Sequence, residues 1–141
     1  MGFLSEQDEA AVRREFERIG GPVTVTVLAS ELGPENNAQT VSLIKEVAAL
    51  SDQITVRVLN PFIEREQAAA YGIEVTPAIV VEGAIDYGIR FLGLPGGYEF
   101  ANLIDSIIAA STGQTGLSAE TMAALAALPG DVDIKVFATP T

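Results

Sequence analysis

The sequence predicts an α/β domain built on a four-stranded mixed sheet with helices on both faces. Three observations lead to this prediction. Strand-like segments alternate with amphipathic helical segments, the last two strand segments are close enough to form a hairpin, and the chain then repeats its opening pattern. Strands that alternate with helices need parallel crossovers, whereas a hairpin adds an antiparallel edge. With 141 residues the chain can bury a core of its own.

Each element follows from its local pattern. Ser5 precedes an acidic first turn, which is typical of a helix start, and the Gly-Gly-Pro run at 20–22 ends that helix. The β-branched run Val23–Leu28 is typical of a strand. The other predicted strands are 54–59, one that begins at Ala78, and one near 87–92. The other predicted helices run from Asn36 or Asn37 to about Leu50, from Asn60-Pro61 to about Tyr71, and over 98–110.

The end of the chain repeats its beginning. Val132–Thr139 matches Val23–Ser30 in every apolar and polar position, 109 residues later, and each follows a helix and a Gly/Pro break. A repeat at this scale indicates a second fold unit. We therefore expect residues 1–111 to form one unit, 112–117 a linker, and 118–141 the first helix and strand of a second unit.

The composition excludes several kinds of chemistry. The chain has no Cys and no His, so it offers no thiolate, no imidazole and no soft-metal ligand. We predict no metal site and no cofactor. A net charge of −11 argues against nucleic acid and against anionic membranes as partners. The sequence shows neither a membrane-spanning run nor a secretory signal, and we expect a cytoplasmic protein.

Thr76-Pro77 interrupts an otherwise strand-like run. A central strand does not tolerate proline, so the strand is expected to start after it, at Ala78. An ordinary trans proline at a strand start is one interpretation. The element order with Thr76-Pro77 before the third strand also resembles the thioredoxin fold. That resemblance implies a cis bond, with Val75, Thr76 and Pro77 forming an edge that binds extended peptide substrates.

A closer resemblance is to the glutaredoxin-like protein disulfide oxidoreductases, which carry two thioredoxin-fold units in tandem. The N-terminal domain of the flavoprotein subunit of alkyl hydroperoxide reductase is similar. The segments that carry the resemblance are 43–54, 71–78 and, most specifically, 89–100 (Ile-Arg-Phe-Leu-Gly-Leu-Pro-Gly-Gly-Tyr-Glu-Phe). The resemblance implies a thioredoxin-like unit followed by the first helix and strand of a second, truncated thioredoxin-like unit.

The resemblance also locates the missing chemistry. The family carries a Cys-x-x-Cys at the start of the helix after the first strand, and the matching positions here are Pro34 and Asn37. Neither residue can form a disulfide, so we predict a catalytically degenerate unit. In the family, the segment matching 139–141 runs directly into the second Cys-x-x-Cys. We therefore expect the working cysteines of the parent protein after this point.

Three other hypotheses remain open. The unit is a non-enzymatic module that binds a protein or peptide client beside Pro77, or it is a structural scaffold. Carboxylate chemistry by Glu31, Glu35 and Asp86 is a further alternative, although nothing in their spacing favours it. The alternating segment 132–138 needs a partner strand, which predicts pairing with an edge of the first sheet or homodimerisation.

Overall fold

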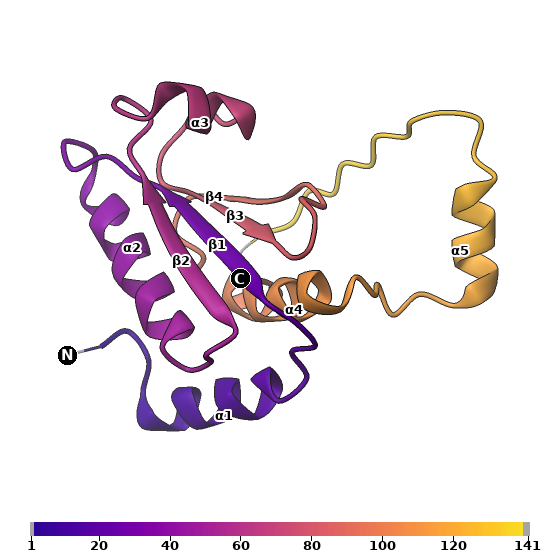
Figure 1. The fold of residues 1–141 in the computed structure, drawn as a ribbon, viewed down its shortest axis with the longest axis horizontal. Helices are drawn as coiled ribbons and strands as arrows, with labels where there is room; N and C mark the ends of the chain where they lie inside the picture. The colour runs from indigo at the N-terminus through magenta and orange to yellow at the C-terminus, as the bar shows by residue number, and fades with distance from the viewer. Residues whose placement is uncertain (1, 140–141) are drawn as a thin grey trace.

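The computed structural model describes residues 2–139 (Figure 1). Its elements follow the predicted order: α1 (Glu6–Phe16), β1 (Val23–Leu28), α2 (Glu35–Ala48), β2 (Ile54–Leu59), α3 (Arg65–Ala70), β3 (Ala78–Glu82), β4 (Ile89–Leu92), α4 (Tyr98–Thr112) and α5 (Ala119–Ala126). The sheet order is β2-β1-β3-β4. β1 runs parallel to β2 and antiparallel to β3, and β4 is antiparallel to β3. The predicted mixed four-stranded sheet is confirmed.

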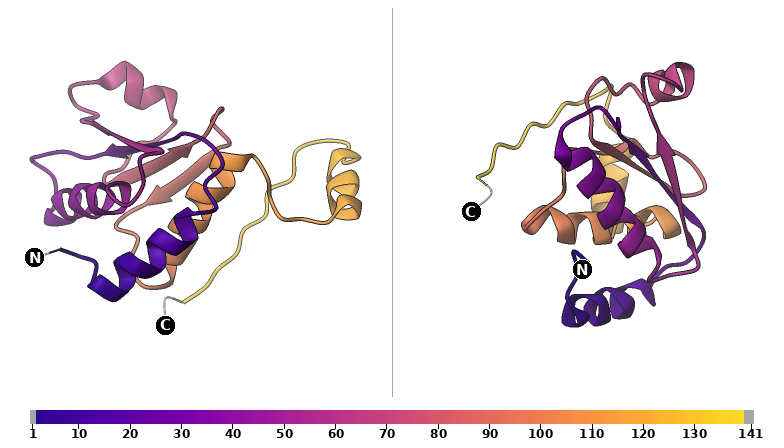
Figure 2. Two further views of the ribbon diagram at one scale, coloured as in Figure 1. Left: turned by 60° about the horizontal axis from the view of Figure 1, so that its bottom comes forward. Right: turned by 90° about the vertical axis from the view of Figure 1, so that its left-hand side faces the viewer.

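Alternate residues of β1 place their side chains in two separate cores. Val23, Val25 and Val27 pack with α1, α2 and α4 in the larger core. Leu28 faces the other side and packs with Ala68 of α3 in the smaller one. Helices therefore cover both faces of the sheet, as Figure 2 shows from two further directions. Within residues 2–139, every helix is too short or too polar to cross a bilayer.

The helix starts show where local patterns succeed and where they fail. Ser5 caps α1 as predicted, because its hydroxyl accepts a hydrogen bond from the Asp8 N–H at 3.1 Å. The predicted start of α2 at Asn36 or Asn37 is slightly too late, since α2 begins at Glu35 with Pro34 as its N-cap. The predicted helix after Asn60 begins only at Arg65. The Asn60 side chain accepts a hydrogen bond from the Phe62 N–H at 3.0 Å, which holds that segment in a turn.

The segment after α4 stands apart from the domain. Ser118 caps α5, but every residue from 112 to 139 is exposed. The predicted strand at 132–138 does not form, and the prediction that it pairs with the first sheet is wrong. The segment is extended with its apolar side chains in solvent, Ile134 being 82% and Phe137 92% exposed. Within residues 2–139, no neighbouring strand forms hydrogen bonds with its backbone. Homodimerisation through it stays a prediction.

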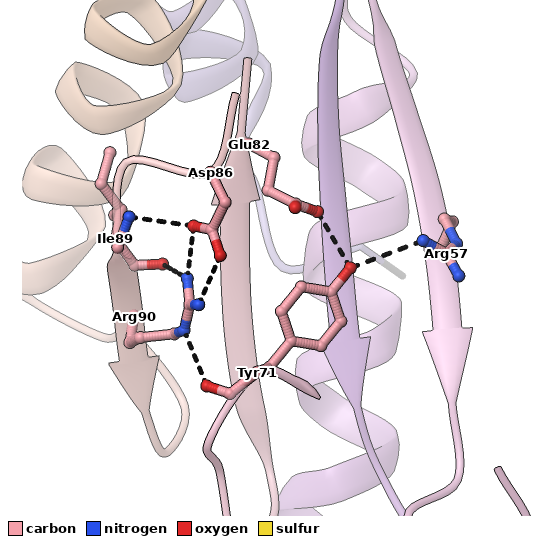
Figure 3. A network of polar contacts seen from close by, with 7 residues as sticks. Arg57, Tyr71, Glu82, Asp86, Ile89 and Arg90 are labelled. Carbon is pink, nitrogen blue, oxygen red and sulfur yellow. Dashed lines mark hydrogen bonds and ion pairs between the residues drawn. The ribbon is translucent and has the colours of Figure 1, made fainter. Parts of the chain in front are cut away.

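A polar network ties the β3–β4 hairpin to the rest of the sheet (Figure 3). Arg90 donates two hydrogen bonds to the Asp86 carboxylate, at 2.9 and 2.7 Å. The same guanidinium donates to the Tyr71 carbonyl at 3.3 Å and lies 5.4 Å from the centre of the Tyr71 ring. The Tyr71 hydroxyl donates to Glu82 at 3.0 Å, and Arg57 donates to that hydroxyl at 3.5 Å. The network thus joins β2, β3, β4 and the end of α3.

The Asp86–Arg90 pair predicts a loss of stability in acid. Hydrogen bonds from Arg90 lower the pKa of Asp86 from 3.8 to about 2. Because this pKa is lower in the folded state, the stabilisation is present above pH 3.8 and is lost as the pH falls toward 2. Asp86→Asn should therefore cost about 1 kcal/mol near neutral pH, a small value because both side chains are partly exposed.

Urea unfolding followed by circular dichroism at neutral pH and near pH 2 measures this effect. The difference in stability between the two pH values should be smaller for Asp86→Asn than for the parent chain. Asp105→Asn is the matched control, since Asp105 is exposed and forms no ion pair within residues 2–139. Equal acid sensitivity of the parent and Asp86→Asn would contradict the prediction.

Candidate functional site

The candidate site lies at the carboxyl end of β1, where the loop 29–34 leads into α2. The Ala29 N–H donates to the Leu59 carbonyl at 2.9 Å, which places the loop beside the end of β2. On the other side, Leu28 lies opposite Ala78, the residue that follows Pro77. The sheet therefore brings the loop before α2 and the proline segment to the same edge.

The two positions predicted to match the missing cysteines lie one turn apart at the start of α2. Pro34 is the N-cap and is exposed. Asn37 is the third helical residue and is only 2% exposed. Residues three apart share one face of a helix, so the side chains at the two predicted positions start on the same side of α2.

Asn37 uses its buried amide to hold the loop in place. Its Oδ1 accepts a hydrogen bond from the Ser30 N–H at 3.0 Å, and its Nδ2 donates to the Pro34 carbonyl at 3.1 Å. One side chain thus joins the beginning of the loop to its end. The sequence does not reveal this role, because only the tertiary placement of the loop shows that the amide points back to Ser30.

Gly33 allows the loop to approach Asn37 closely. The Gly33 N–H donates to the Ser30 carbonyl at 3.0 Å and closes a tight turn. A Cβ at Gly33 would lie 2.8 Å from Asn37 Nδ2 and 3.1 Å from the Ser30 carbonyl oxygen. Leu32 sits at the tip of this turn and is 99% exposed. A firmly held turn therefore presents an apolar side chain to solvent.

The proline segment has an open backbone. The Thr76–Pro77 peptide bond is cis. Pro77 is buried and its carbonyl accepts a hydrogen bond from the Gly93 N–H at 2.8 Å, which fixes the segment against the end of β4. Val75 is 51% exposed. Within residues 2–139, no hydrogen bond engages the backbone of Val75 or Thr76.

The three carboxylates considered as catalytic acids do not come together. Glu31 and Glu35 are exposed beside the loop. Asp86 lies in the β3–β4 hairpin at the opposite end of the sheet, where Arg90 engages it. In the described part of the chain, no three acidic residues gather as a metal site would require. The arrangement does not support general acid/base chemistry by these residues.

Comparison with known proteins identifies the fold. No family model matches the chain, and no curated protein does. Among solved structures, a thioredoxin from Fasciola hepatica matches with a TM-score of 0.51 and 17% identity over 72% of this chain and 92% of its own. The chain has a thioredoxin fold, as its sequence predicts.

Two longer proteins match more completely. The AhpF protein of Enterococcus faecalis alkylhydroperoxide reductase, solved as a mutant, matches with a TM-score of 0.81 and 25% identity over 90% of this chain. A protein disulfide oxidoreductase of Aeropyrum pernix matches with a TM-score of 0.78 and 24% identity over 89%. The chain spans 62% and 56% of these two proteins. The two proteins are of the two kinds that the sequence is predicted to resemble, and both share the thioredoxin-like fold of this chain.

The contact between Asn37 and Gly33 predicts a coupled effect on stability. Asn37→Ala should cost about 1–3 kcal/mol, because the Ser30 N–H loses its acceptor in a buried place. Gly33→Ala should cost a similar amount in the parent chain through the clash with Asn37 Nδ2. The two costs should not add, since removal of the amide relieves that clash.

A double-mutant cycle measured by urea unfolding tests this coupling. The double variant should be more stable than the sum of the single effects implies, by at least about 0.5 kcal/mol. Gly96→Ala serves as the control, because a Cβ at Gly96 meets no atom within 4 Å. Strict additivity of Asn37→Ala and Gly33→Ala would show that the amide does not control the loop.

Proposed function

We propose that this chain is a catalytically degenerate thioredoxin-fold unit of a glutaredoxin-like protein disulfide oxidoreductase. The proposal is supported by the residues at Pro34 and Asn37, the two positions that the resemblance assigns to cysteines. Pro34 caps α2, and the Asn37 amide holds the loop by hydrogen bonds where the family has a thiol. The unit keeps the framework of the redox site and has no group that accepts or donates electrons as a thiol does.

The framework that remains is the one thiol chemistry uses. A cysteine at the start of a helix has a lowered pKa, because the backbone N–H groups and the helix dipole stabilise its thiolate. α2 still presents its amino end at Pro34, with 14 residues of helix behind it. The unit therefore acts through its shape and surface, and the redox steps of the parent protein belong to a second unit.

Two observations support a second unit. α5 and the extended segment after it repeat the order of α1 and β1, including a serine N-cap. The likeness to the E. faecalis protein covers 90% of this chain, which is more than residues 1–111 contain. We propose that a Cys-x-x-Cys follows the repeated strand pattern in the parent protein.

Restoring the two cysteines tests the assignment of the site. The unsubstituted chain should not reduce insulin disulfides. The double variant Pro34→Cys with Asn37→Cys should form a disulfide within one chain, because residues three apart on a helix lie within bonding distance. Counting free thiols before and after oxidation, with mass spectrometry to exclude dimers, measures this outcome.

The matched control is Pro34→Cys with Gln39→Cys, whose side chains start five residues apart on different faces of α2. It should keep both thiols free under the same oxidation. Circular dichroism checks that both variants fold, since Asn37→Cys also removes the loop hydrogen bonds. Reduction of insulin by the unsubstituted chain would contradict the proposal. Disulfide formation in the control variant alone would contradict it as well.

A second candidate function is binding of an extended peptide at Val75–Pro77. The unengaged backbone of Val75 and Thr76 favours it, because an extended chain that adds to such an edge gains main-chain hydrogen bonds. A purely structural scaffold would leave this edge unused.

Amide chemical shifts of the labelled chain during titration with an extended peptide test this function. Binding should shift the amides of residues 73–78. Val75→Pro should weaken it several-fold by removing one N–H donor, whereas Val132→Pro in the exposed tail should not. Amide shifts confined to other regions would exclude peptide binding at Val75–Pro77 and favour a structural scaffold.

A further inference from the structure

A groove lies between α2, the loop before it and the end of β2. Its volume is about 470 Å³, and its walls are the loop 29–34, the flank of α2 and Val58. Neither Thr76 nor Pro77 lines it. Its apolar lining residues are Ala29, Pro34, Ala38, Val41 and Val58. Val58 is 44% exposed there, and Leu32 stands nearby on the same loop.

The backbone of β2 is open along this groove. β2 is an edge strand whose inner side pairs with β1. The carbonyls of Gln53 and Leu59 accept hydrogen bonds from β1 and its extension, so odd-numbered residues of β2 point their backbone inward. In a parallel ladder the intervening residues point theirs outward. Val56 and Val58 therefore direct their N–H and C=O groups to the free edge.

The groove has charge of opposite sign at its two ends. Glu31 and Glu35 are exposed at the end nearest the loop. Lys45 lies at the other end, ten residues further along α2, which is about 15 Å on a helix. That length fits an extended segment of four or five residues at roughly 3.3 Å each. The acidic end favours a cation, and Lys45 disfavours one at the far end.

We propose that the β2 edge binds an extended, alternating apolar segment of a partner protein whose end near Glu31 and Glu35 carries lysine or arginine. The segment pairs with the outward backbone groups of Val56 and Val58. Its apolar side chains lie against Val58 and Val41. This site does not depend on the proposed function, because it uses neither the cysteine positions as reacting groups nor the edge at Thr76.

Two peptides test the proposal. Both carry the Val-Thr-Val pattern of β1, the strand that already pairs with β2. One is acetylated Lys-Lys-Val-Thr-Val-Ser amide, and the other has glutamates in place of the lysines. Titration of the labelled full chain should shift the amides of Val56 and Val58 most. The lysine peptide should bind at least fivefold more tightly at low salt, and added salt should reduce the difference.

Matched variants separate the two parts of the recognition. Val58→Pro removes one outward N–H and leaves the pairing with β1 intact, so it should weaken the binding of both peptides. Glu31→Gln with Glu35→Gln should weaken only the lysine peptide. Glu6→Gln with Glu99→Gln removes the same charge elsewhere and should leave the affinity for both peptides unchanged. Circular dichroism of each variant confirms that it folds.

Other outcomes overturn the proposal. Equal affinity for both peptides would show that the site does not select a basic partner. Shifts confined to residues 73–78 would show that the peptide binds at the edge formed by Val75–Pro77 instead. The tail of a second copy is a rival occupant. A dimer in light scattering that Val58→Pro dissociates would assign the edge to that tail instead. None of these results bears on whether cysteines at positions 34 and 37 form a disulfide.

Discussion

Burial of β1 between two strands and two cores is the constraint on which the rest of the structure depends. β1 pairs with β2 on one side and β3 on the other, and Val25, Val27 and Leu28 are almost fully buried. Its register fixes where the chain leaves the sheet at Ala29 and where β3 begins at Ala78. Every feature of the candidate site therefore sits where the end of this strand places it.

Under the proposed function, the site keeps a redox framework without redox chemistry. A buried Cys-x-x-Cys would constrain the start of α2 through its sulfur atoms. Here the Asn37 amide constrains it through hydrogen bonds to Ser30 and Pro34. A buried amide is costly unless its partners are present, and in this loop both its oxygen and its nitrogen are engaged. The loop and Asn37 therefore depend on each other, and Gly33 is the residue that lets them meet.

Two backbone segments near the candidate site have no partner within residues 2–139, and they differ in character. The edge at Val75 and Thr76 is short and adjoins the buried Pro77. The edge of β2 is longer, adjoins an apolar groove and carries glutamates at one end. Both segments are the places where we propose that an extended chain binds. The tail after α5 adds an exposed apolar segment whose partner the described residues do not supply.

The sequence by itself determined the element order, the mixed sheet and the absence of thiol chemistry. Alternation of β-branched residues and helical spacing are local signals, and a missing cysteine needs no structure to be recognised. Tertiary structure alone decided that α2 has Pro34 rather than an asparagine at its N-cap, that Asn37 is buried, and that residues 132–138 pair with no strand within residues 2–139. Those outcomes depend on which distant groups reach a given backbone atom. The Asn37 amide can bond to Ser30 only when β1 is in place in the sheet. A sequence with a strand pattern forms a strand only where a neighbouring strand pairs with its backbone.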